Sequence, residues 1–100
     1  ALVMHAGGLC GNFTTRPQRV AQIYGSLDGL SPGGSQRFAT PLIPLTNPAL
    51  TQIVAIQGGV HYTFADYGYQ APDNVNIISF ESHQSQAADL TVSNLAIAFQ

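Results

Sequence analysis

Short apolar runs that end in glycine or proline turns are the feature that most constrains this chain. The clearest runs cover residues 19–25 and 51–57, and each ends at or just before glycine. Runs of this length with apolar residues on alternating faces are typical of β-strands, and the spacing of an amphipathic helix is almost absent. The Gly58-Gly59 pair leads directly into residues 60–64, which predicts a tight hairpin.

Further short strands are predicted over residues 35–40, 75–82 and 90–99, whereas residues 84–89 favour at most one helical turn. Short strands separated by turn residues favour an all-β domain. We therefore expect one domain over residues 1–100, a small antiparallel β-sandwich of about six strands, with a small barrel as the alternative and an irregular N-terminal segment over residues 1–18.

Composition excludes two classes of partner, nucleic acid and the membrane interior. Charged residues make up only 8 % of the chain, against roughly 25 % in soluble domains, and the net charge is −2 with no lysine. Nucleic-acid binding depends on a cluster of basic residues that neutralise phosphates, which this chain lacks. No apolar run approaches the roughly 18 residues that cross a bilayer. The sequence predicts neither nucleic-acid binding nor membrane insertion.

Metal and cofactor sites have no support in the spacing of ligand residues. The three histidines, His5, His61 and His83, are far apart in sequence, and His61 is expected to be a half-exposed strand residue. The single cysteine, Cys10, cannot form an intramolecular disulfide and is interpreted as a small buried apolar residue. We expect no metal and no cofactor.

Catalysis is likewise not expected, since no Gly-x-Ser-x-Gly motif places a nucleophile on a strained turn. The alternative is a glycosidase in which the one glutamate, Glu81, meets Asp66 or Asp73 at one end of a sandwich. Asn12 begins a triplet that fits the N-glycosylation pattern.

A cluster of tyrosine, aspartate and asparagine residues within fifteen positions is the candidate binding site. Aromatic rings stack on the apolar faces of sugars, and carboxylate and amide groups hydrogen-bond to sugar hydroxyls. The alternative is that the aromatic residues belong to the core or to an interface and that the polar ones form a solvated turn. The proposed saccharide-binding residues are Tyr62, Asp66, Tyr67, Tyr69, Asp73, Asn74 and Asn76.

The layout of residues 38–100 resembles that of H-type lectins and of the related receptor-binding tips of bacteriophage tail fibres. The resemblance rests on a proline-containing entry at residues 38–44, a hydrophobic strand, an aromatic hairpin, and the alternation in the final strand at residues 95–98. It implies a six-stranded sandwich that trimerises and displays loops to a cell-surface glycan.

These observations predict a non-catalytic receptor-binding or adhesive tip domain of an extracellular viral or phage fibre, located on the virion, that binds a cell-surface saccharide. The alternative is a structural subunit of a viral capsid, tail or filament with contacts only to itself. Both hypotheses include a homo-oligomer, with a trimer favoured, because both faces of residues 51–57 and 90–99 are apolar and would otherwise be exposed.

Overall fold

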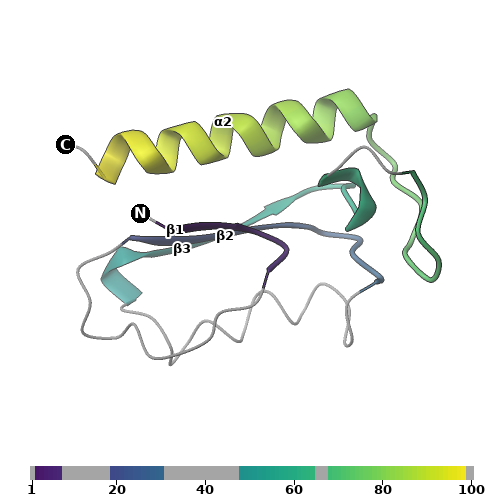
Figure 1. The fold of residues 1–100 in the computed structure, drawn as a ribbon, viewed down its shortest axis with the longest axis horizontal. Coiled ribbons are helices and arrows are strands. Elements are labelled where there is room, and N and C mark those ends of the chain that lie inside the picture. Colours follow the sequence, from purple (N-terminus) through teal and green to yellow (C-terminus); the bar gives the residue numbers. More distant parts are fainter. Residues whose placement is uncertain (1, 8–18, 31–47, 65–67, 99–100) are drawn as a thin grey trace.

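A parallel β-sheet covered on one face by a long helix forms the part of the protein that the computed structural model describes, residues 2–7, 19–30, 48–64 and 68–98 (Figure 1). The strands there are β1 (Leu2–His5), β2 (Val20–Gly25) and β3 (Thr51–Ile56), and the helix is α2 (Phe80–Ala98). Two short 3-10 helices, η1 (Pro48–Leu50) and η2 (Tyr62–Phe64), flank β3 in the chain.

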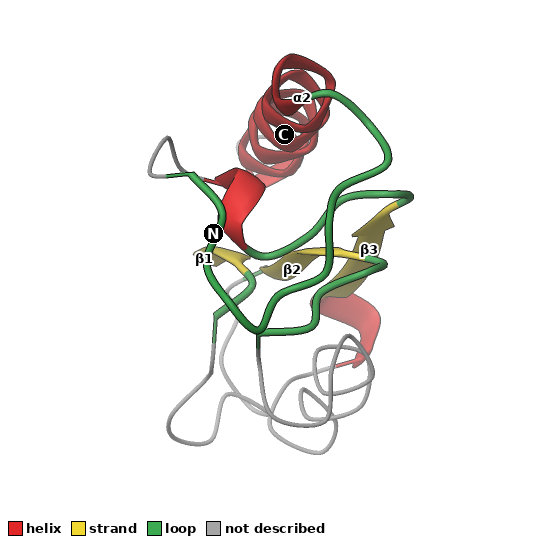
Figure 2. Cartoon of the chain, turned by 90° about the vertical axis from the view of Figure 1, so that its right-hand side faces the viewer, coloured by secondary structure: helices red, strands yellow, loops and turns green. Residues whose placement is uncertain are grey.

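The three strands are ordered β1-β2-β3, and both pairings are parallel. Leu2 pairs with Val20, and Val20 in turn pairs with Thr51, so the three strands begin at the same level and end at the same edge. Viewed from the end of the sheet, α2 lies over one face only (Figure 2). The expected antiparallel β-sandwich of about six strands is therefore wrong, because the described fold is an α/β layer.

The strands predicted over residues 19–25 and 51–57 are confirmed as β2 and β3. The hairpin predicted at Gly58-Gly59, directly after β3, is wrong. Gly58 has a φ of 80°, which turns the chain away from β3, and the chain then enters η2 instead of returning as an antiparallel strand. Residues 2–5, which fall within the segment expected to be irregular, form β1. The strand predicted over residues 35–40 lies outside the described residues.

The central strand β2 is buried on both faces, which explains why apolar residues occur on both of them. On the face away from the helix, Met4 and Val20 form one buried cluster. On the face towards the helix, Ile23 and Ile56 pack against Ala87 of α2. For residues 51–57, which include β3, we interpreted apolar residues on both faces as evidence for subunit contacts, but this pattern is also usual for a parallel strand inside one chain.

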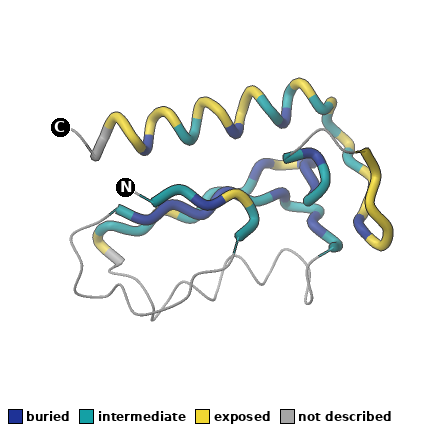
Figure 3. Tube along the Cα trace, in the orientation of Figure 1, coloured by how far each residue is buried: buried dark blue, intermediate teal, exposed yellow. Residues whose placement is uncertain are grey.

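Residues 75–79 form no strand and residues 80–98 form helix α2, so the strands predicted over residues 75–82 and 90–99 are wrong. Its inward positions recur every three to four residues, and the buried ones are His83, Ala87 and Asn94 (Figure 3). Two of these three are polar, while Val92 on the same helix is exposed, so the sequence carries little of the helical hydrophobic period. Ser79 begins the helix, where its hydroxyl accepts a hydrogen bond from the Ser82 amide.

The trimer stays a prediction, but one of the two apolar strands from which it was inferred, residues 90–99, is not a strand. Residues 90–98 belong to a helix, so they present no apolar strand face to a neighbouring subunit.

His83 gives a testable pH dependence of stability. Burial lowers the pKa of His83 below its ordinary value of about 6.5, and the nearby His5 lowers it further. Below about pH 6.5 the unfolded chain therefore binds a proton that the folded chain does not, so the free energy of unfolding falls with falling pH by at most about 1.4 kcal/mol per pH unit. Chemical denaturation between about pH 7 and pH 5 should show a smaller decline for His83→Gln than for the unmodified protein. Parallel curves for the two proteins would contradict this assignment.

Candidate functional site

Two loops meet at the carboxyl edge of the sheet, one after β2 and one after β3. The Ser26 amide donates to the Ile56 carbonyl over 3.0 Å, and the Leu27 amide donates to the Gly59 carbonyl over 2.9 Å. The Ser26 hydroxyl also accepts a hydrogen bond from the Gly58 amide over 2.8 Å. These bonds continue the pairing of β2 with β3 beyond the strands, so the two loops are held together by their backbones.

Asp28 from the first loop and His61 from the second form a hydrogen-bonded side-chain contact at this edge. The Asp28 Oδ2 atom lies 2.8 Å from His61 Nδ1, and the side chain of Asp28 is fully buried whereas that of His61 is 25 % exposed. The other carboxylate oxygen, Oδ1, accepts the Leu30 amide over 3.1 Å, and the Asp28 amide closes a turn by donating to the Gly25 carbonyl. The carboxylate therefore lies behind the imidazole, and the imidazole reaches solvent.

This contact fixes how the imidazole of His61 carries its protons. An ionised carboxylate only accepts hydrogen bonds, so Nδ1 of His61 is the protonated nitrogen, and in the neutral ring Nε2 then carries a lone pair. Among the described residues, the contact with Asp28 is the one hydrogen bond of the His61 side chain. The Nε2 atom is thus chemically available as a proton acceptor.

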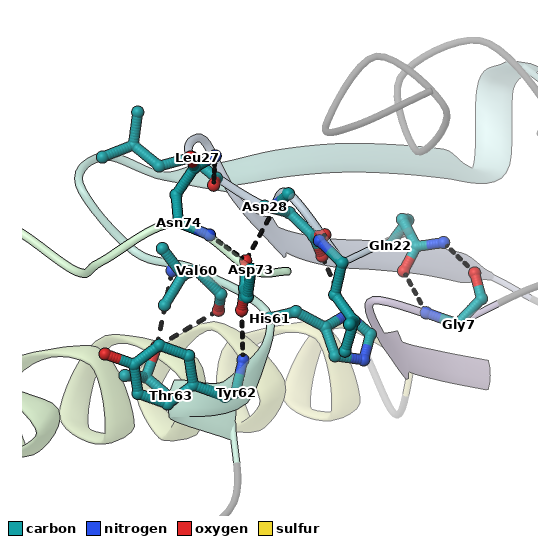
Figure 4. Close-up of polar contacts among 12 residues, drawn as sticks. Gly7, Gln22, Leu27, Asp28, Val60, His61, Tyr62, Thr63, Asp73 and Asn74 are labelled. Atoms are coloured by element: carbon teal, nitrogen blue, oxygen red, sulfur yellow. Dashed lines mark hydrogen bonds and ion pairs between the residues drawn. The ribbon is translucent and has the colours of Figure 1, made fainter. Parts of the chain in front are cut away.

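Asp73 lies between the two loops and is buried, with 3 % of its surface exposed (Figure 4). Its Oδ1 accepts the Gly29 amide over 2.8 Å, and its Oδ2 accepts the Tyr62 amide over 2.9 Å. A further bond to Oδ1 comes from the Asn74 amide over 2.8 Å. The carboxylate is therefore surrounded by backbone N–H donors from three places in the chain.

The structure brings together five of the seven predicted saccharide-binding residues, and most of their polar groups are used internally. The Tyr62 hydroxyl donates to Asn76, and the Tyr69 hydroxyl donates to the Asp73 carbonyl over 2.9 Å. The rings of Tyr62 and Tyr69 meet edge to face at 5.5 Å, and the Asn74 amide group donates to the Leu27 carbonyl over 2.7 Å. Tyr69 is the exposed aromatic ring of this group, at 56 %.

Asp66 and Tyr67, the other two predicted binding residues, lie outside the described residues, as do Cys10 and Asn12. Of the carboxylates considered for a glycosidase, Glu81 is exposed in the first turn of α2, whereas Asp73 is buried.

Away from these loops, a hollow of about 270 Å³ lies between the end of β1 and α2. Its lining is mostly apolar and consists of His5, Phe64, Gln84, Ala87, Ala88, Thr91 and Val92. The Thr91 hydroxyl donates to the Ala87 carbonyl, so it accepts from Nε2 of His5 over 2.9 Å. The ring of His5 stacks on the ring of Phe64, and the Phe64 ring also meets the buried ring of His83 edge to face. This hollow does not include Asp28 or His61.

Asp28 and His61 were missed by the sequence analysis, which expected His61 within a strand and gave Asp28 no role. The signal that could have found them is positional. Each of the two clearest strands is followed within a few residues by a titratable side chain, and parallel strands would bring both side chains to one edge. The hairpin interpretation of Gly58-Gly59 obscured this, because an antiparallel return would have separated them.

Within the described ranges, no three histidine, cysteine, aspartate or glutamate residues lie close enough to hold a metal ion. No helix in the same ranges is long and apolar enough to span a membrane. Comparison of the chain with protein-family models, with curated proteins and with solved structures gave no match. The resemblance to lectins and fibre tips stays a prediction.

Gly25 is needed where the two loops approach each other. A Cβ atom at Gly25 would overlap the Gly59 carbonyl group and lie 2.6 Å from the Val60 amide nitrogen, and neither backbone group can rotate away. We expect Gly25→Ala to lower the free energy of unfolding by at least about 2 kcal/mol. Gly7→Ala is the matched control, since its added Cβ would meet Met4 at an ordinary 3.5 Å. Equal stability of the two variants in urea denaturation would contradict the close approach.

Proposed function

We propose that this protein is a hydrolase of acyl substrates, such as esters. In this proposal His61 is the base of a nucleophilic catalytic triad, and Asp28 is the carboxylate that orients it. The observation that carries the proposal is the 2.8 Å contact between the buried Asp28 carboxylate and Nδ1 of the partly exposed His61. In a triad, the carboxylate orients the imidazole through Nδ1 and leaves Nε2 to act on the nucleophile.

The position of the pair in the fold supports this proposal. Both residues follow the carboxyl ends of adjacent parallel strands, which is where open α/β sheets place their ligand sites. The acid comes after one strand and the histidine after the next strand in the chain. The same order, acid before histidine, is found in the α/β-hydrolases, whose nucleophile precedes both. This part of the argument is an analogy at the level of fold and chain order.

The proposed chemistry follows from the protonation of His61. The Nε2 atom of His61 removes the proton from a serine or cysteine nucleophile as it attacks the acyl carbon, and then transfers this proton to the leaving alcohol. Nε2 next removes a proton from water as the water attacks the acyl-enzyme, and it returns this proton to the nucleophile as the carboxylic acid leaves. The Asp28 carboxylate holds the ring in the Nδ1-protonated tautomer and stabilises the imidazolium that forms in between. No hydroxyl of the described residues bonds Nε2 of His61, so the nucleophile is the residue that chemical labelling has to identify.

The glycan-binding domain and the structural subunit predicted from the sequence stay predictions. Of the proposed saccharide-binding residues that the structure describes, Asp73 is buried, and Tyr62 and Asn76 bond to each other. Tyr69 and Asn74 are exposed but are also engaged within the chain. The internal use of these groups is the reason that the geometry favours catalysis over sugar binding.

Ester hydrolysis by the full-length protein tests the proposal. We expect turnover of p-nitrophenyl acetate or butyrate, reduced about 10³- to 10⁴-fold by Asp28→Asn and by His61→Gln. Asp89→Asn is the matched control, because Asp89 lies exposed on α2 and makes the same change of charge away from the site. Circular dichroism and thermal unfolding report whether each variant is folded.

Labelling with a fluorophosphonate probe identifies the nucleophile. Because the probe reacts with a hydroxyl that a histidine activates, we expect one labelled residue if the nucleophile is serine, and one residue labelled by iodoacetamide instead if it is cysteine. Peptide mass spectrometry locates the labelled residue, and the label should be lost in folded His61→Gln. The proposal is contradicted if folded protein neither hydrolyses the esters nor takes up the label, or if both reactions persist in Asp28→Asn and His61→Gln.

A further inference from the structure

We infer that Asp73 is a positioning residue, which sets the distance between Asp28 and His61 by binding the backbones of both loops. This inference rests on the proposed function, because it assigns Asp73 a role in the activity of that same pair. Asp73 itself contacts neither the Asp28 carboxylate nor the His61 ring by any hydrogen bond recorded among the described residues.

The two bonds that carry the inference end on the residues next to the pair. Oδ1 of Asp73 accepts the amide of Gly29, which directly follows Asp28, over 2.8 Å. Oδ2 accepts the amide of Tyr62, which directly follows His61, over 2.9 Å. One carboxylate therefore spans the two loops at the positions that directly follow Asp28 and His61, and Figure 4 shows its oxygens directed at both backbones.

Asp73 is itself fixed, so it can act as a rigid spacer. Its own loop is tied to the first loop by the Asn74 side chain, which donates to the Leu27 carbonyl over 2.7 Å. The loop is tied to the turn after β3 by the Ile77 amide, which donates to the Gly58 carbonyl over 3.0 Å. Hydrogen bonds from backbone amides to a buried carboxylate are among the stronger kinds, so movement of either loop against Asp73 is opposed.

The donor pattern around Asp73 shows which change breaks one tie and keeps the other. Asparagine has the same shape, but one of its two terminal groups is a donor. Its oxygen is best placed where Oδ1 lies, because two amides, those of Gly29 and Asn74, converge there. Its NH₂ group then faces the Tyr62 amide, donor against donor. Asp73→Asn should therefore release the backbone beside His61 while retaining the tie beside Asp28.

The experiment combines amide hydrogen exchange with steady-state kinetics in the full-length protein. In Asp73→Asn we expect the Tyr62 amide to exchange at least about tenfold faster, with the Gly29 amide much less affected. We expect kcat for p-nitrophenyl butyrate to fall about 10- to 100-fold with little change in KM, because misplacement of a base by about 1 Å costs this much and Asp73 does not touch substrate.

Two controls separate positioning from general destabilisation. Tyr69→Phe removes a hydrogen bond from the same loop, to the Asp73 carbonyl, without altering the amides of Gly29 or Tyr62. Asp89→Asn makes the identical chemical change at an exposed site on α2. Both should retain kcat and slow exchange at Tyr62, even where thermal unfolding shows that Tyr69→Phe is destabilised as much as Asp73→Asn.

The possible failures are distinguishable. If hydrolysis by the unmodified protein does not depend on His61, the proposed function fails, whatever Asp73→Asn does. If hydrolysis depends on His61 but Asp73→Asn keeps both its kcat and slow exchange at Tyr62, the positioning role of Asp73 is wrong. Equal losses of kcat in Asp73→Asn and Tyr69→Phe would also overturn it, since the effect would then follow stability of the loop alone.

Discussion

The parallel pairing of β2 with β3 is the constraint on which the rest of the described structure depends. Because the two strands run in the same direction, both of their carboxyl ends lie at one edge, and the loops that follow them start side by side. The Ser26–Ile56 and Leu27–Gly59 backbone bonds extend this pairing past the strands. An antiparallel arrangement of the same strands would place the two loops at opposite edges, and Asp28 could not reach His61.

Several polar side chains of the described structure are buried. Asp28 and Asp73 are buried at the loop edge, while Gln22 and His83 are buried on opposite faces of the sheet. A buried polar group is costly unless it is hydrogen-bonded, and three of these four meet backbone groups: the amides on the two carboxylates and both the amide and the carbonyl of Gly7 on Gln22. His83 bonds Thr63 through Nδ1, and its Nε2 has no partner among the described residues. The bonds on Asp28 and Asp73 fix the geometry of the loops at the carboxyl edge of the sheet.

The sequence predicted the central strands well and the architecture poorly, for identifiable reasons. Residues 19–25 and 51–57 show strand character locally, through β-branched residues and terminal glycines. Their parallel pairing is a long-range property, and the intervening chain gave no helical pattern that would reveal a crossover. Helix α2 was missed because its inward positions include His83 and Asn94, while Val92 and Leu95 point outward. Asp73 was selected as a polar candidate, but its buried role between two loops depends on contacts 44 and 11 residues away in sequence.

The tautomer of His61 tests the central claim most directly, because it reports the contact with Asp28 independently of any substrate. The two ring nitrogens of a neutral histidine have distinct ¹⁵N chemical shifts, so NMR of the labelled full-length protein identifies which one carries the proton. The account predicts a neutral His61 that is protonated at Nδ1 and loses this preference in Asp28→Asn. A neutral His61 protonated at Nε2, or a tautomer that is unchanged by Asp28→Asn, would contradict the assignment of His61 as the base of the site and of Asp28 as the carboxylate that orients it.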